Sequence, residues 1–244
     1  KNLEREGKKF DPTPFSFVDF GTRRRFSKSW QRLVLKTFKE KASDKNFAGT
    51  SNVMFAKELG VEPIGTQAHE WFEAGQALDN VSLVNSQKYM LELWEDVYRG
   101  KLAIALTDTI TTENFLEDFD LYLAKLYDGV RQDSGDPKEI GDMIIGHYES
   151  LGIDPTTQTL ICSDGLDWPK AIELWKYFNG RIGIAFGIGT KTLNDFEEDT
   201  SIQIVIKMVR CNGKPVAKIS DTRGKTIAGK DAYLDKLMNA FGVD

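Results

Sequence analysis

Short runs of β-branched and aromatic residues alternate with longer amphipathic segments along most of this chain. The short runs predict strands and the amphipathic segments predict helices, an alternation typical of βα units around a parallel sheet. The predicted strands are residues 15–20, 63–65, 102–106, 129–132, 159–162, 182–186 and 202–208. The predicted helices are residues 23–41, 52–59, 82–99, 113–125, 137–151, 169–178 and 231–240.

The spacing of apolar residues within the predicted helix 23–41 also indicates which face is buried. Large apolar residues recur there every three or four positions, as they do on the core-facing side of an amphipathic helix. The members of this predicted face are Phe26, Trp30, Leu33, Val34 and Phe38.

The two ends of the chain differ from the βα pattern. Asn212-Gly213 lies between the apolar runs 202–208 and 215–219, which is a strong signal for a β-hairpin. We therefore expect residues 15–200 to form one α/β domain and residues 201–244 to form a β-hairpin and helix of a second domain. The chain begins at Lys1 without an initiator methionine, signal segment or helix cap. We expect residues 1–14 to be the remnant of an N-terminal domain of a longer protein.

Glycine, serine, aspartate, arginine and histidine residues gather directly after most of the predicted strands. In a βα barrel the loops that follow the strands converge on one face, and that face carries the chemistry. The alternative is that these residues only cap the following helices. The clusters are residues 20–25, 65–70, 107–109, 131–136, 163–165 and 187–191.

Two of these clusters have the chemistry of an anion site. The backbone of Gly187 and Gly189 can approach a phosphate closely, and Thr190 begins the following helix, whose amides point toward an anion. Arg131 can hold pyrophosphate, while Asp133 can accept from sugar hydroxyls or bind Mg²⁺. Arg131 and Asp133 can also form a simple surface pair. Asp136, before a proline, is better explained as a helix N-cap.

Two further clusters add an aromatic ring, a cation and a histidine. Phe20 can stack on a flat ligand or belong to the core, and Arg23 follows the same strand. His69 lies just past a Gly-Thr turn beside Glu70, whose carboxylate can orient the imidazole ring. Together the clusters predict a site for a phosphorylated sugar and one further anionic or flat partner.

Composition narrows the class of protein. The chain has 244 residues, with 32 Lys and Arg against 37 Asp and Glu and a net charge of −5. This balance argues against a general nucleic-acid or anionic-membrane binder. The mean hydropathy is −0.37, and no apolar run reaches the length of a membrane span. Cys162 and Cys211 are the only cysteines, which excludes a disulfide framework and predicts a reducing, cytoplasmic location.

The same motifs resemble those of nicotinate phosphoribosyltransferases. They are D-F-G-T-R-R-R at 19–25, G-T-S-N at 49–52, G-T-Q-A-H-E-W at 65–71, R-Q-D-S-G at 131–135, S-D-G-L-D at 163–167 and F-G-I-G-T at 186–190. The resemblance covers nearly the whole chain and implies the irregular, incomplete TIM-like α/β barrel of type II phosphoribosyltransferases. It also implies a homodimer with a shared active site.

The activity implied by the resemblance belongs to NAD biosynthesis. Nicotinate and phosphoribosyl pyrophosphate form nicotinate mononucleotide and pyrophosphate, coupled to ATP hydrolysis through a phosphohistidine at His69 and assisted by Mg²⁺. Arg131 and Asp133 are implied to hold the pyrophosphate and the ribose hydroxyls. The implied substrate contacts are Phe20, Arg23, Thr50, Ser51, Asn52, Ser163, Asp164, Gly165, Gly187, Gly189 and Thr190.

Ser51 bears on the choice between the acid and the amide. The related nicotinamide enzyme has an aspartate after the Gly-Thr pair, and an aspartate would repel the nicotinate carboxylate, whereas a hydroxyl can donate to it. The alternatives are a quinolinate or nicotinamide phosphoribosyltransferase and a non-catalytic nucleotide-binding fragment. A barrel aldolase would need a desolvated lysine at a strand end. Lys191 and Lys207 are the nearest candidates, and neither is expected to lie in that position.

Overall fold

The computed structural model describes residues 14–196, 202, 204–222 and 224–243, and their contacts divide into two compact units. Unit 1 comprises Lys1–Gly65 and Asp154–Ile204, and unit 2 comprises Thr66–Ile153 and Val205–Asp244. The domain limits expected from the sequence, 15–200 and 201–244, stay a prediction. The proposed remnant at 1–14 lies outside the described residues except for Pro14.

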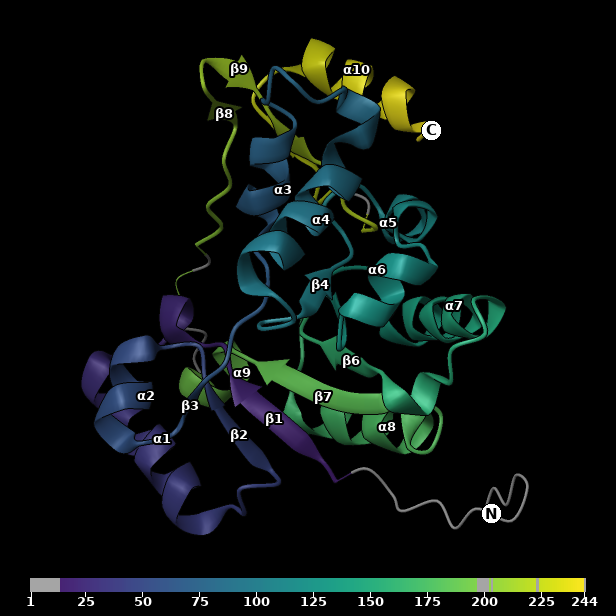
Figure 1. The fold of residues 1–244 in the computed structure, drawn as a ribbon. Helices are drawn as coiled ribbons and strands as arrows, with labels where there is room; N and C mark the ends of the chain where they lie inside the picture. Colours follow the sequence, from purple (N-terminus) through teal and green to yellow (C-terminus); the bar gives the residue numbers. More distant parts are fainter. Residues whose placement is uncertain (1–13, 197–201, 203, 223, 244) are drawn as a thin grey trace. The chain divides into compact units, whose positions relative to one another are not determined.

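Unit 1 contains a parallel sheet (Figure 1). Its strands are β1 (Ser16–Asp19), β2 (Phe47–Thr50), β3 (Glu62–Pro63), β6 (Thr159–Cys162) and β7 (Gly183–Ile188), in the order β3-β2-β1-β7-β6. In the centre, Phe17 of β1 lies opposite Phe47 on one side and Phe186 on the other. The parallel arrangement agrees with the sequence pattern. The sequence pattern did not predict strand β2, because its short segment F-A-G-T shows no clear alternation of apolar and polar residues.

The helices of unit 1 begin at residues that satisfy the first backbone amides. Ser27 accepts from Trp30 N at the start of α1, and Asn52 accepts from Phe55 N at the start of α2. The helical segments are η1 (Thr22–Arg24), α1 (Lys28–Lys41), α2 (Val53–Leu59), η3 (Pro155–Thr157), α8 (Trp168–Phe178) and α9 (Thr190–Leu193).

The predicted buried face of the first helix is partly wrong. Phe26 is 59% exposed and Leu33 is 54% exposed, whereas Gln31 and Leu35 are completely buried. Gln31 is held inside because its amide donates to Asp19 Oδ2 at 2.7 Å and its carbonyl accepts from Arg25 at 2.8 Å. Apolar spacing alone does not reveal a glutamine that is buried by hydrogen bonds.

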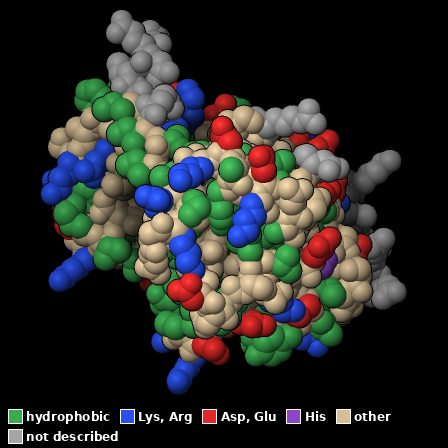
Figure 2. Space-filling model, turned by 90° about the horizontal axis from the view of Figure 1, so that it is seen from above, with side chains coloured by type: hydrophobic (Ala, Val, Ile, Leu, Met, Phe, Trp, Pro, Cys, Tyr) green, Lys and Arg blue, Asp and Glu red, His purple; other side chains and the backbone are tan. Residues whose placement is uncertain are grey.

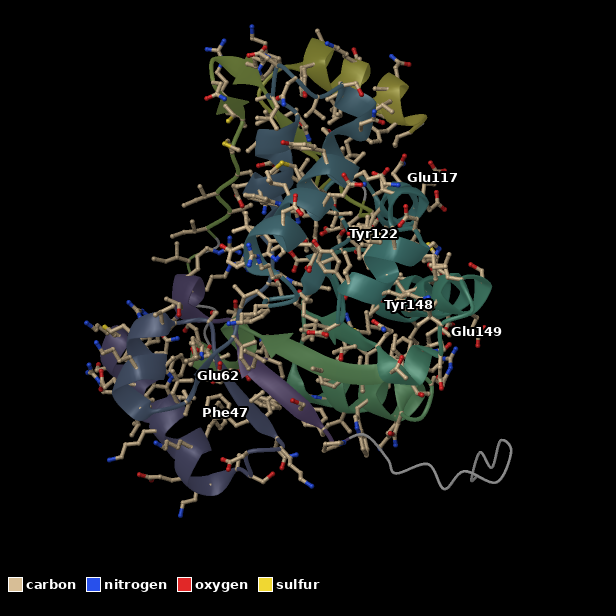
Figure 3. The ribbon with its side chains drawn as sticks, viewed as in Figure 1. Phe47, Glu62, Glu117, Tyr122, Tyr148 and Glu149 are labelled. Carbon is tan, nitrogen blue, oxygen red and sulfur yellow. The ribbon has the colours of Figure 1, made fainter. Side chains whose placement is uncertain are left out.

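Aromatic rings fill the core of unit 1. The Phe17 ring lies 4.9 Å from that of Trp168 and 5.0 Å from that of Phe38, both in edge-to-face contact. Phe47, labelled in Figure 3, completes the group at 5.4 Å from Phe38. These contacts anchor α1 and α8 to the strands and fix the strand ends that carry the candidate site.

Unit 2 combines a pair of parallel strands with a set of helices. The strands are β4 (Ile104–Leu106) and β5 (Gly129–Gln132). The helical segments are α3 (His69–Gly75), η2 (Leu83–Asn85), α4 (Ser86–Tyr98), α5 (Thr112–Asp118), α6 (Leu121–Leu126) and α7 (Pro137–Ser150). Stacked and edge-to-face rings form its core, namely Phe115, Phe119, Tyr127 and Tyr148, of which Tyr148 is labelled in Figure 3.

The single helix predicted at 113–125 is two helices. The break falls at Phe119, and Asp120 then caps α6 by accepting from the amides of Tyr122 and Leu123. A side chain that captures two backbone amides offers the chain a new start in place of helix continuation. The predicted N-cap of α7 is confirmed, because Asp136 Oδ1 accepts from Lys138 N and Glu139 N.

The C-terminal part of unit 2 carries small antiparallel pairs and a final helix. The hairpin predicted at Asn212-Gly213 is confirmed, with positive φ at both residues, between β8 (Arg210–Cys211) and β9 (Lys214–Pro215). The strand predicted at 202–208 is wrong for the described residues, of which Ile202 and Ile206 are 68% and 69% exposed. The remaining elements are β10 (Ala217–Lys218), β11 (Ile227–Ala228) and α10 (Asp231–Phe241).

The surface mixes charge types. Figure 2 shows lysine and arginine side chains interspersed with acidic and hydrophobic ones on the face in view. No helix within the described residues is long and apolar enough to cross a membrane.

Candidate active site

His69 is the best-held of the predicted site residues. It is the first residue of α3 and only 4% exposed. Its Nε2 atom lies 3.0 Å from Asp108 Oδ1, and its Nδ1 atom lies 2.8 Å from Lys207 Nζ. An ammonium group can only donate, so Nδ1 accepts from Lys207 and Nε2 carries the proton that is donated to Asp108. The two partners therefore fix the ring and its tautomer.

Asp108, directly after β4, orients the imidazole ring. Its other oxygen, Oδ2, accepts from both Ser134 Oγ at 2.6 Å and Lys218 Nζ at 2.5 Å. Burial raises the pKa of Asp108, but the hydrogen bond from His69 and the charge of Lys218 outweigh burial and hold that pKa below its usual range. The sequence suggested Glu70 for this orienting role, and the structure assigns the contact to Asp108.

The same surroundings keep His69 neutral. Burial lowers the pKa of His69, and the charges of Lys218 and Lys207 lower it further, while Asp108 acts in the opposite direction. The neutral imidazole donates its Nε2 proton to Asp108 and keeps a lone pair on Nδ1. A nucleophile needs such a lone pair.

Arg131 and Asp133 lie in the same unit as His69. Arg131 donates to Asp133 Oδ1 at 2.8 Å and to Thr66 Oγ1 at 2.9 Å. The other Asp133 oxygen, Oδ2, lies 3.8 Å from His69 Nε2. The end of β5 and the loop after it thus bring a cation and a carboxylate to the phosphoryl-acceptor candidate, as the clustering of strand-end residues predicted.

Two lysines complete this group. Lys218, on β10, is 5% exposed. Lys207 precedes β8, and burial lowers its pKa. The expectation that Lys207 would not be a desolvated lysine near the site is wrong, because its ammonium group contacts His69 directly.

The residues around His69 also bear on metal binding. One ligand atom each from His69, Asp108 and Asp133 lies within 4.8 Å of the others. Mg²⁺ prefers oxygen ligands and usually keeps several waters. The Asp108 oxygens already accept from His69, Ser134 and the charged Lys218, so Asp133 is the member of this set that suits Mg²⁺ carried by a diphosphate.

In unit 1, the structure brings the glycine motif and the predicted stacking residue together. A Cβ atom added to Gly187 would lie 2.4 Å from the Phe20 ring and 3.1 Å from Ser163 Cβ. A Cβ atom on Gly21 would lie 2.8 Å from the carbonyl oxygen of Gly189. Only glycine fits these close approaches, so the loops after β1 and β6 meet the end of β7 and its following loop through Phe20, Ser163 and the two glycines of the motif.

The loop after β2 is built around buried Asp19. Asp19 Oδ2 accepts from Thr50 Oγ1 at 2.7 Å, and the Asp19 carbonyl oxygen accepts from Ser51 Oγ at 3.1 Å. Asn52 donates to Thr22 Oγ1 at 3.1 Å while it caps α2. Thr50 is completely buried, whereas Ser51 is exposed. Thr50 and Asn52 thus shape the loop from which Ser51 projects.

The remaining predicted contacts lie at the ends of other elements of unit 1. Arg23 is exposed within η1, and Thr190 begins α9. Asp164 and Gly165 follow β6, and Gly165 has a positive φ of 56° that favours glycine.

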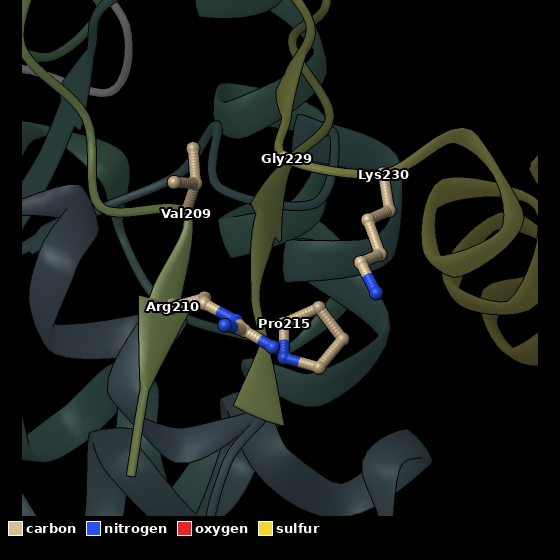
Figure 4. A pocket seen from close by; sticks show the side chains of 5 residues that line it. All are labelled: Val209, Arg210, Pro215, Gly229 and Lys230. Carbon is tan, nitrogen blue, oxygen red and sulfur yellow. The ribbon is translucent and has the colours of Figure 1, made fainter. Parts of the chain in front are cut away.

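A small pocket in unit 2 has a different lining (Figure 4). It lies beside the β8–β9 hairpin, and no predicted site residue contributes to it. Its lining residues are Val209, Arg210, Pro215, Gly229 and Lys230.

Sequence reasoning missed most partners of His69. Asp108 belongs to the strand-end cluster 107–109 and Ser134 to the R-Q-D-S-G motif, but nothing in the local sequence indicates that either contacts the other or His69. Lys207 and Lys218 carried no local signal, because they lie 138 and 110 residues along the chain from His69 and Asp108, the side chains they contact.

Comparison with known proteins identifies the family. The nicotinate phosphoribosyltransferase (NAPRTase) family model matches residues 15–244, so the chain belongs to that family. It is 52% identical over 234 residues to a nicotinate phosphoribosyltransferase of Acinetobacter baumannii, and 50% identical over 233 residues to one of Proteus mirabilis. These alignments cover 96% of this chain and 57% of each relative, so the chain spans a little over half the length of these curated relatives.

Solved structures agree. The crystal structure of nicotinate phosphoribosyltransferase from Vibrio cholerae matches with a TM-score of 0.88 and 47% identity, over 94% of this chain and 56% of that one. A putative nicotinate phosphoribosyltransferase from Saccharomyces cerevisiae matches with a TM-score of 0.82 and 35% identity, over 94% and 59%. The predicted fold class, the α/β fold of this family, is confirmed.

Proposed function

We propose that this chain carries the nicotinate phosphoribosyltransferase activity of its family. In this reaction nicotinate, phosphoribosyl pyrophosphate and ATP give nicotinate mononucleotide, pyrophosphate, ADP and phosphate, a step of NAD biosynthesis. Family membership supports the reaction class. The observation that carries the coupling to ATP is the fixed ring of His69, whose Nδ1 lone pair is directed at Lys207 rather than at a carboxylate.

The first step is phosphorylation of His69. Its Nδ1 attacks the γ-phosphorus of ATP while Asp108 holds the Nε2 proton and stabilises the positive charge that develops on the ring. Lys207 leaves Nδ1 and donates to the incoming phosphoryl oxygens. Lys218, bound to Asp108, keeps the carboxylate ionised and in place.

The second step is phosphoribosyl transfer. Loss of pyrophosphate from ribose C1 leaves negative charge on the leaving group, and Arg131 is positioned by Asp133 and Thr66 to stabilise it. Mg²⁺, when bound with the diphosphate, would neutralise part of the same charge and contact Asp133. Asp133 also accepts from the ribose hydroxyls.

The strand ends of unit 1 bind the rest of the substrates in this proposal. Phe20 stacks on the pyridine ring with Arg23 beside it, and the hydroxyl of exposed Ser51 turns from the Asp19 carbonyl oxygen to donate to the nicotinate carboxylate. The 5′-phosphate and ribose-phosphate contacts are Ser163, Asp164, Gly165, Gly187, Gly189 and Thr190. The close packing of Phe20 on Gly187 supports a shared role for these loops.

The assembly and location are also proposals. The family resemblance implies a cytoplasmic homodimer with a shared active site. Quinolinate or nicotinamide phosphoribosyl transfer and a purely binding role are the alternative functions, and the intact group of His69, Arg131 and Asp133 counts against the binding role.

Product analysis tests this function. The protein, in the longest form that its gene encodes, is supplied with phosphoribosyl pyrophosphate, Mg²⁺ and either nicotinate or nicotinamide, with and without ATP. Chromatography then separates the mononucleotides. We expect nicotinate mononucleotide, formed faster with ATP. Product from nicotinamide alone, or from neither base, would contradict the proposal.

A further inference from the structure

Glu73 is a buried carboxyl group in unit 2 that the proposed reaction does not use. It lies on α3 four residues after His69, so the two side chains leave the same face of the helix. Glu73 is 0% exposed, and neither of its carboxyl oxygens makes a hydrogen bond of normal geometry with the described residues, although the backbone amide of Met208 acts on the carboxylate. A buried carboxylate without a well-formed hydrogen bond is costly, so its presence on the same helix face as His69 calls for an explanation.

Charged groups from three parts of unit 2 act on Glu73. Its pKa is raised to about 7, mainly by burial and also by the charge of Glu70 on the same helix. Lys207, Lys218 on β10 and the backbone amide of Met208 act in the opposite direction. Lys207 is also the ammonium group that contacts His69 Nδ1. Glu73 and the phosphoryl-acceptor atom therefore depend on the same partly buried cation.

We propose that Glu73 is an exchangeable counter-charge for this cluster. As a carboxylate it balances Lys207 while His69 is unmodified, and it takes up a proton when His69 carries a phosphoryl group. This proposal rests on the proposed ATP coupling. Without the proton, a carboxylate and a phosphoryl group would compete for Lys207 in a buried site, where like charges repel strongly.

The step balances in atoms and charge. The His69 Nδ1 lone pair forms a bond to the γ-phosphorus, the bond from that phosphorus to the bridging oxygen breaks, and ADP leaves with the electron pair. The Nε2 proton remains in the hydrogen bond to Asp108. The proton that neutralises Glu73 therefore comes from solvent, which makes it measurable.

The experiment measures proton uptake during phosphorylation. The longest form of the protein is mixed with ATP and Mg²⁺ in weakly buffered solution containing a pH indicator, and phosphohistidine is quantified in parallel. Glu73→Gln removes the exchangeable proton. Glu95→Gln is the matched control, because Glu95 is a buried glutamate of α4 whose carboxylate accepts from Gly100 N at 3.0 Å. Comparison with this control cancels protons released or bound by the nucleotides.

We expect the wild type and Glu95→Gln to take up nearly one proton per phosphohistidine at pH 8, and about half a proton at pH 7, where a group of that pKa is half protonated beforehand. Glu73→Gln should form phosphohistidine without this uptake. Equal uptake in Glu73→Gln and the wild type would overturn the proposal. Absence of phosphohistidine in the wild type would overturn the ATP coupling itself and this proposal with it.

Infrared difference spectroscopy tests the same proton uptake in the wild type alone, so the result does not depend on whether Glu73→Gln folds. On phosphorylation of the wild type at pH 8, a carbonyl band of a newly protonated buried carboxylic acid should appear. If phosphohistidine forms and no such band appears, Glu73 does not take up the proton.

Discussion

Replacement of Asp108 by asparagine tests the arrangement around His69 most directly. Asp108 is completely buried and accepts from His69 Nε2, Ser134 Oγ and Lys218 Nζ. Asparagine keeps the shape but loses the charge, and its amide nitrogen must face one of these donors. Lys218, itself 5% exposed, then becomes a buried cation without its counter-ion.

The magnitude follows from that unpaired charge. Removing one partner of a buried ion pair costs about 3–5 kcal/mol in the free energy of unfolding. For a chain of this size each kcal/mol lowers Tm by about 2–4 °C, so Tm should fall by roughly 6–20 °C near neutral pH. The pKa of Asp108 is lowered in the folded state, so its stabilisation exists above the unfolded pKa of about 3.9 and is lost as the pH falls below that value.

Catalysis should fall in a selective way. The variant no longer fixes the His69 tautomer, and the ATP-coupled rate should fall by about 10²–10⁴-fold, as when a carboxylate behind a reactive histidine becomes an amide. Transfer without ATP should fall much less, because Arg131 and Asp133 keep their contacts with each other and with Thr66.

Matched variants separate these effects. Asp118→Asn is the control, since Asp118 is a partly buried carboxylate that accepts from the neutral amide of Gln87. Combining Asp108→Asn with Lys218→Met removes both charges and should restore most of the lost Tm without restoring ATP coupling. Calorimetry and product assays measure both. An unchanged Tm for Asp108→Asn would refute the reasoning. Full ATP stimulation in Asp108→Asn, or in its combination with Lys218→Met, would also refute it.

Three further predictions follow from the same structure. His69→Ala should abolish ATP stimulation and leave slower, ATP-independent transfer in a product assay; full stimulation would remove His69 from its role. Ser51→Asp should lower kcat/KM for nicotinate about tenfold or more through like-charge repulsion, and an unchanged value would place Ser51 outside the base site. Burial raises the pKa of Glu73 from its usual value near 4.5 to about 7, so the folded state binds more protons than the unfolded state between these values and its stability falls as the pH rises through them. Glu73→Gln should therefore gain up to about 3 kcal/mol of unfolding free energy over the wild type at pH 8 and almost none at pH 4; equal gains at both pH values in denaturant titrations would contradict this.

Local patterns predicted the strands well because burial leaves a short-range signal. The limits of β5 and β6 match the predicted runs, and Asp136 and Asn212-Gly213 act through contacts within a few residues. The pattern failed where a side chain captured the backbone amides of its neighbours, and where an apolar run found no strand to pair with in the described residues. Asp120 starts a new helix, and the apolar run 202–208 forms no strand in its described part.

The candidate site was predicted by position rather than by contact. Strand-end clustering found His69, Arg131 and Asp133, because parallel strands release their loops at one edge. It did not find which acid faces His69. Glu70 is adjacent in sequence, but His69 and Glu70 are successive residues of α3 and so leave the helix in different directions. Asp108 reaches the ring from a neighbouring strand end.

The charged groups around His69 come from both segments of unit 2, residues 66–153 and 205–244. Both lysines that act on His69 come from this C-terminal stretch, Lys207 from the segment before β8 and Lys218 from β10. Without residues 205–244, His69 would lie beside the carboxylates of Asp108 and Asp133. Among the described site residues, Arg131 would then be the remaining cation. A phosphoryl group on His69 would then face carboxylates without a neutralising ammonium group. Residues 205–244 therefore do more than pack on the core around Ile110, since they bring the positive charge that the proposed phosphohistidine would need.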